Sequence, residues 1–138
     1  MKEVALRAAK FYFVGALGIV VQLAALAILK PALDPHYLWA TALAVEFAIL
    51  HNFLWHEFWT WSDRPSFGND RLRRLWRFHI SNGLLSLVGN VLLMRFLVGA
   101  LGLHYLLANA LAIASLAVAN FFLSELYVFR YLIRRPGN

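Results

Sequence analysis

Four long apolar runs, each bounded by polar residues, dominate the chain. They extend from Phe11 to Leu29, Tyr37 to Phe58, Phe78 to Leu101 and Tyr105 to Leu126. A helix of about 20 mostly apolar residues crosses a bilayer. Strands fit poorly, because backbone in contact with lipid requires helices or a closed barrel, and these runs lack the alternation of a barrel. The pattern therefore predicts an all-α integral membrane protein with four transmembrane helices.

The connections between the runs predict two helical hairpins. The segments 31–35 and 102–103 are short, which favours antiparallel neighbours within each pair. The middle connection, 62–75, is longer and polar. We expect it to be a cytoplasmic linker between the two halves of a single membrane domain that covers residues 1–138.

The second half of the chain repeats the first at an offset of 68 residues. Between 36–61 and 104–129, 10 of 26 positions are identical. Self-similarity at a fixed spacing indicates a duplicated structural unit. We therefore predict two two-helix repeats, one covering about 8–61 and the other about 76–131. Because each repeat has an even number of spans, the two are expected to be parallel in the membrane.

Composition supports a membrane protein and excludes several classes of site. Hydrophobic residues make up 62% of the chain and charged residues 14%, whereas soluble domains are about 45–50% apolar and about 25% charged. Without cysteine, disulfides and thiolate metal sites are impossible. His51 and His56 do not have the i, i+4 spacing of a helical zinc site. Since no nucleotide-binding loop or catalytic constellation is recognisable either, we expect no enzyme activity, cofactor or metal.

The positive charges predict the orientation. Of the 13 Lys and Arg residues, 11 lie before the first run, between the second and third runs or after the fourth run: Lys2, Arg7, Lys10, Arg64, Arg71, Arg73, Arg74, Arg77, Arg130, Arg134 and Arg135. Lys30 and Arg95 are the exceptions. The positive-inside rule places both termini and the linker in the cytoplasm. Charges that flank spans argue against a nucleic-acid-binding face.

Related motifs end the second and fourth runs. Residues 51–61 read HNFLWHEFWTW, residues 120–130 read NFFLSELYVFR, and residues 10–15, at the start of the first run, read KFYFVG. These segments resemble the paired Asn-Phe and aromatic motifs of the GtrA-like family. The resemblance covers residues 10–130 and includes the length and four-span plan of that family.

The resemblance implies a translocase (flippase) for polyprenyl-phosphate-linked sugars across the cytoplasmic membrane, serving cell-surface polysaccharide glycosylation. It also implies a separate membrane glycosyltransferase that makes the sugar donor. The family usually carries a basic residue shortly after Asn-Phe, whereas this chain has Glu57 and Glu125. Those positions therefore do not fit a plain phosphate-binding role. A non-transporting anchor or scaffold for a glycosyltransferase is an alternative. A small proton-coupled multidrug exporter that uses Glu46 is another, although such exporters favour a carboxylate in the first span.

The candidate residues for the lipid phosphate are arginines. Arg74 and Arg77 lie one turn apart at the start of the third run, and guanidinium groups bind phosphate in bidentate fashion. Arg95, late in the same run, either receives the phosphate after transfer or only reaches the outer head groups. Trp59 and Trp61 either stack on the sugar or belong to an interfacial aromatic belt.

Polar side chains within or at the end of the runs are candidates for contact with the sugar or head group: Glu46, Gln22, Asn90, Asn52, Asn120, Glu57 and Glu125. An ionisable group at the membrane centre costs about 2.5–3.5 kcal/mol on insertion scales, so Glu46 needs either a proton-coupling or sugar-binding role or a hydrogen bond to a neighbouring helix. Helix clamping is the alternative for Asn52 and Asn120, and ion pairing is the alternative for the two motif glutamates.

A homodimer is the remaining expectation. Four helices enclose little volume, and small residues such as Ala24, Gly83 and Gly89 would allow two copies to pack closely.

Overall fold

The computed structural model describes residues 2–33 and 37–130, and every element within these ranges is a helix. The chain divides into two compact units, residues 1–65 and 66–138. The boundary between them lies inside the linker that the sequence predicts. The expected turn residues 34–36 and the basic residues Arg134 and Arg135 lie outside the described residues.

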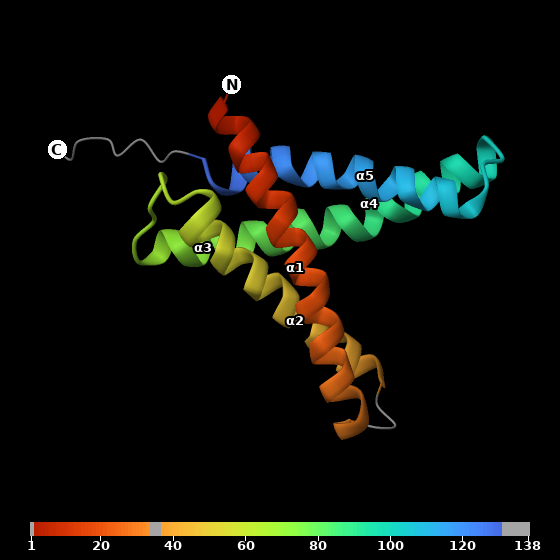
Figure 1. The fold of residues 1–138 in the computed structure, drawn as a ribbon, viewed down its shortest axis with the longest axis horizontal. Coiled ribbons are helices and arrows are strands. Elements are labelled where there is room, and N and C mark those ends of the chain that lie inside the picture. Colours follow the sequence, from red (N-terminus) through yellow and green to blue (C-terminus); the bar gives the residue numbers. More distant parts are fainter. Residues whose placement is uncertain (1, 34–36, 131–138) are drawn as a thin grey trace. The chain divides into compact units, whose positions relative to one another are not determined.

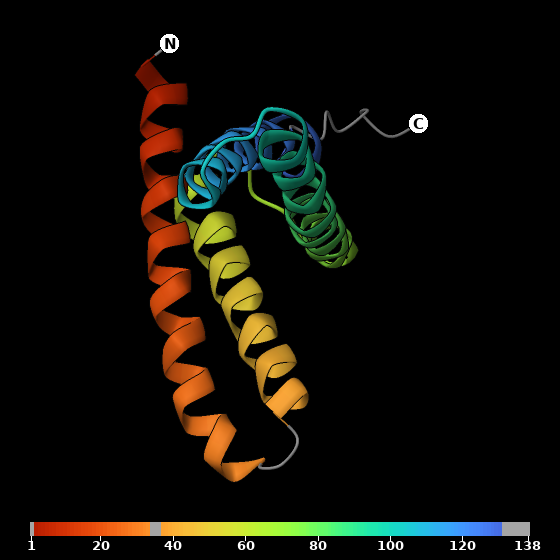
Figure 2. The ribbon, with the colours of Figure 1, turned by 90° about the vertical axis from the view of Figure 1, so that its right-hand side faces the viewer.

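Unit 1 is a pair of long helices packed side by side (Figures 1 and 2). Helix α1 spans Lys2–Ala32, and α2 spans Tyr37–Trp55 and continues as the π-helix η1, His56–Thr60. Three buried alanines of α2 recur every four positions: Ala40, Ala44 and Ala48. Small side chains at this spacing form one helical face and let two helix backbones approach closely.

Unit 2 has one long, interrupted helical path and a second helix beside it (Figure 1). The path comprises α3 (Asn69–Phe78), the π-helix η2 (His79–Leu84), α4 (Leu85–Met94) and the π-helix η3 (Arg95–Ala100). After a turn that includes Gly102 at φ 65°, α5 (Tyr105–Leu123) continues as the π-helix η4 (Ser124–Val128). The buried face of α5 again recurs every four residues, at Ala108, Ala112 and Leu116.

Each unit has an aromatic core where its last helix ends in a π-helix, η1 in unit 1 and η4 in unit 2. In unit 1, Trp61 is fully buried beside Phe11 and His56, and the His56 ring stacks on Phe11 with ring centroids 4.7 Å apart. In unit 2, Phe129 is fully buried, and its ring centroid lies 6.2 Å from that of Phe78. These cores hold the end of the second helix of each unit against the start of the first.

Buried positions recur at the spacing of 68 residues. They form seven pairs: Ala40/Ala108, Ala44/Ala112, Ala48/Leu116, Phe53/Phe121, His56/Ser124, Thr60/Val128 and Trp61/Phe129. The π-turns recur as well, because the Trp61 N–H donates to the His56 carbonyl at 2.9 Å and the Phe129 N–H to the Ser124 carbonyl at 2.8 Å. That the chain is two parallel repeats stays a prediction, but positions at this spacing have matching local environments.

Among the described residues, three helices are long and apolar enough to cross a membrane: Lys2–Ala32, Asn69–Ala100 and Leu106–Val128. The remaining predicted span, Tyr37 to Phe58, is helical as α2 and η1. An all-helical membrane protein is therefore confirmed. The orientation of the termini and the homodimer stay predictions.

Candidate functional site

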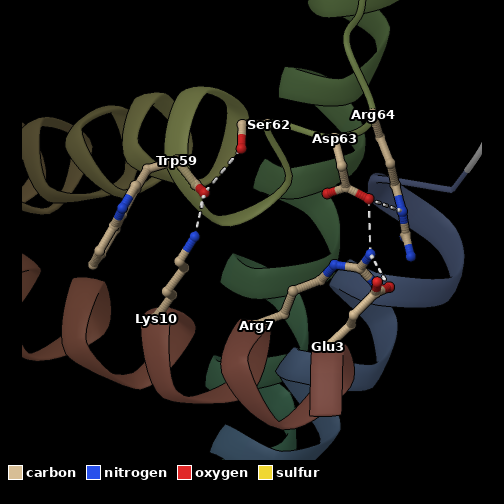
Figure 3. Close-up of polar contacts among 7 residues, drawn as sticks. All are labelled: Glu3, Arg7, Lys10, Trp59, Ser62, Asp63 and Arg64. Carbon is tan, nitrogen blue, oxygen red and sulfur yellow. Dashed lines mark hydrogen bonds and ion pairs between the residues drawn. The ribbon is translucent and has the colours of Figure 1, made fainter. Parts of the chain in front are cut away.

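Basic side chains of α1 meet the end of η1 in unit 1 (Figure 3). Arg7 forms ion pairs with Asp63 at 2.7 Å and with Glu3 at 3.8 Å. Asp63 also lies 3.8 Å from Arg64. The charge of Arg7 is thus balanced by carboxylates within its own unit.

Lys10 has different surroundings. Its Nζ donates a hydrogen bond to the Trp59 carbonyl at 3.2 Å and lies 5.2 Å from the centroid of the Trp59 ring (Figure 3). Ser62 donates to the same carbonyl at 3.4 Å. Among the described residues no carboxylate pairs with Lys10. An ammonium has three donors, so this half-buried cation keeps donors for an anion.

Arg74 and Arg77 both face aromatic rings of unit 2. The guanidinium carbon of Arg74 lies 5.7 Å from the centroid of the Phe129 ring, and that of Arg77 lies 5.1 Å from the centroid of the Tyr127 ring. Arg74 is buried, with 3% of its surface exposed. Arg77 is half-buried and, within residues 2–33 and 37–130, forms neither a hydrogen bond nor an ion pair. All five of its N–H donors are therefore available to a ligand.

Four polar side chains on the two long helical paths of unit 2 are here called the polar seam. It consists of Ser86 and Asn90 on α4, Asn120 on α5 and Ser124 in η4. Asn120 Nδ2 donates to Ser86 Oγ at 2.9 Å. Three buried atoms of the seam, Asn90 Oδ1, Asn120 Oδ1 and Ser124 Oγ, have no hydrogen-bond partner in the described part of the chain. Burying an oxygen without a hydrogen-bond donor is costly.

In unit 1 the corresponding positions are Gly18, Gln22, Asn52 and His56. Asn52 lies against Gly18 so closely that a Cβ at position 18 would clash with its amide. Its Oδ1 lies 3.1 Å from His51 Nδ1. Gln22 is half-buried on α1. Asn52 is thus in close contact with α1.

The two motif tryptophans differ in accessibility. Trp59 is half-buried, and its ring is approached by Lys10, by Phe13 with centroids 5.9 Å apart and by Trp55 with centroids 5.8 Å apart. Trp61 has no exposed surface, so it presents no free face to a sugar in this structure. Both belong to unit 1, whereas Arg74 and Arg77 belong to unit 2.

The remaining predicted residues are distributed over both units. Glu46 is exposed on α2, whereas Phe53 and Glu57 are buried. Glu125 is half-buried in η4. Arg95 is exposed in η3 and lines a shallow hollow with Leu92 and Phe96. No cluster of metal-ligating side chains is present among the described residues.

The prediction from sequence missed Lys10, Tyr127, Ser86 and Ser124 as candidate site residues. Lys10 lies over the Trp59 ring, and Tyr127 supplies the ring that Arg77 faces. The two serines belong to the polar seam. The signal for Ser124 and Tyr127 was in the repeat, since they occupy the positions of His56 and Trp59.

The fold and the site define a helical membrane protein with cationic, aromatic-lined ends and no recognisable catalytic centre in its described part. Comparison with known families gives the more specific assignment. The family described as "GtrA/DPMS, transmembrane domain" matches residues 10–129. The chain therefore belongs to the GtrA/DPMS transmembrane-domain family, as its motifs predicted.

A curated relative adds one further likeness. The chain is similar to a dolichol-phosphate mannosyltransferase of Pyrococcus furiosus, with 38% identity over 109 residues. The similarity covers 78% of this chain but 29% of the relative. The chain thus spans less than a third of the length of the relative it matches.

Proposed function

We propose that the protein binds a polyprenyl-phosphate-linked sugar by its phosphate and moves the sugar head group across the membrane. The observation that carries this proposal is Arg77, a half-buried guanidinium on the Tyr127 ring with no acceptor among the described residues. A cation with free donors beside an aromatic ring suits a sugar phosphate, because guanidinium binds phosphate oxygens and an aromatic face stacks on a sugar ring.

The lipid class is supported by the comparisons. The matching family includes the transmembrane domain of DPMS by its description, and the similar protein is a dolichol-phosphate mannosyltransferase by name. A polyprenyl phosphate has a long apolar tail and one charged end. If the tail stays in the lipid, the protein needs to shield only the polar head.

The polar seam supports the transfer step. Asn90, Asn120 and Ser124 present buried oxygens without donors from the described chain. Hydroxyl groups of a passing sugar would supply those donors and lower the cost of its transfer through apolar surroundings. On this proposal the phosphate docks at Arg77, the sugar follows the seam, and Arg95 receives the phosphate on the outer side.

A binding measurement tests the docking step. Arg77→Gln should weaken the binding of a short-chain polyprenyl-phosphate sugar in neutral nanodiscs by about tenfold, which corresponds to about 1.4 kcal/mol. The matched control is Arg73→Gln, because Arg73 is an exposed arginine of α3 that lies 3.9 Å from Asp70. Equal weakening by both variants would show that only general surface charge is involved and would reject the site.

A second candidate function is a non-transporting membrane anchor for a glycosyltransferase. It is favoured by one observation: this chain corresponds to 29% of the length of a relative whose name is that of a mannosyltransferase. An anchor would bind lipid phosphate without speeding its movement between leaflets. Co-purification of a membrane glycosyltransferase together with an unchanged rate of lipid movement would support the anchor over the translocase.

A further inference from the structure

The sequence around Arg77 has a counterpart at the start of α1. Residues 7–11 read RAAKF and residues 74–78 read RLWRF, so each segment has an arginine, a second cation three residues later, and then a phenylalanine. Both phenylalanines, Phe11 and Phe78, are buried. The spacing between the segments is 67 residues, one less than the spacing of the rest of the repeat.

The π-helix η2 accounts for the difference of one residue between the two spacings. It spans His79–Leu84, directly after Phe78, whereas α1 continues as an unbroken α-helix through the corresponding region. A π-turn closes with an i→i+5 hydrogen bond and therefore holds one residue more than an α-turn. Before η2 the equivalent residues are 67 apart, as in Lys10 and Arg77, and after it they are 68 apart, as in Gly18 and Ser86.

With this correction, the two cation–ring pairs become equivalent. Lys10 lies 5.2 Å from the centroid of the Trp59 ring, and Arg77 lies 5.1 Å from the centroid of the Tyr127 ring. Trp59 and Tyr127 are 68 residues apart, each at the fourth position of its π-helix. Each unit therefore places a cation over an aromatic ring at the same two structural positions.

The surroundings of the two cations are equivalent as well. Both are half-buried, and neither pairs with a carboxylate within residues 2–33 and 37–130. Arg7, by contrast, already pairs with two carboxylates. A partly desolvated cation is costly without a counter-charge, and a cation on a ring face still has donors directed elsewhere. Lys10 thus offers the same unfilled anion site as Arg77.

We propose that each unit holds its own lipid-phosphate site, so that the protein binds two polyprenyl-phosphate head groups, one at Arg77 and Tyr127 and the second at Lys10 and Trp59. The second site is assigned by the contacts of unit 1. This inference rests on the proposed function only in naming a polyprenyl phosphate as the ligand.

Native mass spectrometry of the full chain in mild detergent with short-chain polyprenyl phosphate tests this proposal by counting bound lipids. The parent should bind up to two copies, Lys10→Gln and Arg77→Gln one each, and the double variant none. Gln at position 10 keeps an amide that can donate to the Trp59 carbonyl, so the loss reports on charge. Lys10→Arg should restore two copies, and Arg73→Gln should leave two. A tenfold excess of phosphatidylglycerol should not displace either copy.

The outcomes separate the two proposals. If no polyprenyl phosphate binds to the parent, the proposed function fails. If the parent binds one copy, lost in Arg77→Gln and kept in Lys10→Gln, the proposed function stands and the second site is rejected. Displacement by phosphatidylglycerol would overturn the assignment of both sites to polyprenyl phosphate.

Discussion

Asn120 donates a hydrogen bond from Nδ2 to Ser86 Oγ at 2.9 Å, which joins α5 to α4. The equivalent pair in unit 1 is Asn52 and Gly18, where the asparagine amide packs directly against the glycine. The same asparagine position therefore contacts the first helix in both units. It does so through a hydrogen bond in one unit and through close packing in the other.

The Asn120–Ser86 hydrogen bond should contribute measurably to stability. Ser86→Ala leaves the Asn120 amide without its acceptor, and hydrogen bonds between membrane helices contribute about 0.6 kcal/mol on average. We expect a loss of about 0.5–1.5 kcal/mol in unfolding experiments in detergent. Ser115→Ala, at an exposed position of α5, is the control and should change little. An equal loss for the two variants would contradict the role of the hydrogen bond.

Two glycines of α1 should respond to alanine in opposite directions. At Gly18 a Cβ would clash with the Asn52 amide, whereas at Gly15 it would meet nothing within 4 Å. Gly15→Ala should be neutral or stabilise by up to about 1 kcal/mol through helix propensity. Gly18→Ala should destabilise by about 1–3 kcal/mol through overpacking.

Thermal unfolding of both glycine variants in one detergent measures the difference. Adding Asn52→Ala to Gly18→Ala removes the side chain that the new methyl group meets, so it should recover most of the loss. A Gly18→Ala variant as stable as Gly15→Ala would show that α1 and α2 do not pack as closely as described.

The aromatic cores predict unequal effects for two tryptophans near the linker. Trp61 is fully buried, whereas Trp76 is 64% exposed. Trp61→Ala leaves a cavity and should cost about 3–5 kcal/mol, seen as loss of folded protein in size-exclusion chromatography. Trp76→Ala should elute like the parent. Normal folding of Trp61→Ala would contradict the burial of Trp61 in the aromatic core at the end of η1.

The predicted orientation can be tested with single cysteines, because the chain has none of its own. Phe67 in the linker is 72% exposed, and His104 before α5 is exposed. Phe67→Cys should react with an impermeant maleimide only after the cytoplasmic side is opened, and His104→Cys should react in intact cells. Labelling of both from the same side would overturn the positive-inside assignment.

The helices were predictable because long apolar runs directly reflect membrane spans, and the linker was predictable because its polarity breaks them. Charge placement also identified Arg77 as a phosphate candidate. These features depend on composition over many residues, which a single sequence shows clearly.

The details of the site depend on features that the pattern does not contain. Trp59 and Trp61 look alike in sequence, but one ring meets Lys10 while the other is enclosed beside Phe11. Lys10 was missed because a fixed offset of 68 aligns it with Phe78 rather than with Arg77. The π-turn that causes the shift is a change of backbone hydrogen bonding, which leaves no mark in hydropathy.

Movement of lipid between leaflets tests the central claim most directly. Purified protein is reconstituted in vesicles with a short-chain polyprenyl-phosphate sugar, and the fraction accessible to an external sugar-modifying reagent is followed over time. We predict faster movement with the parent than in protein-free vesicles, slower movement with Arg77→Gln, and parental movement with Arg73→Gln. A rate equal to that of protein-free vesicles, from correctly folded protein that binds the lipid, would contradict translocation and leave the membrane anchor as the function.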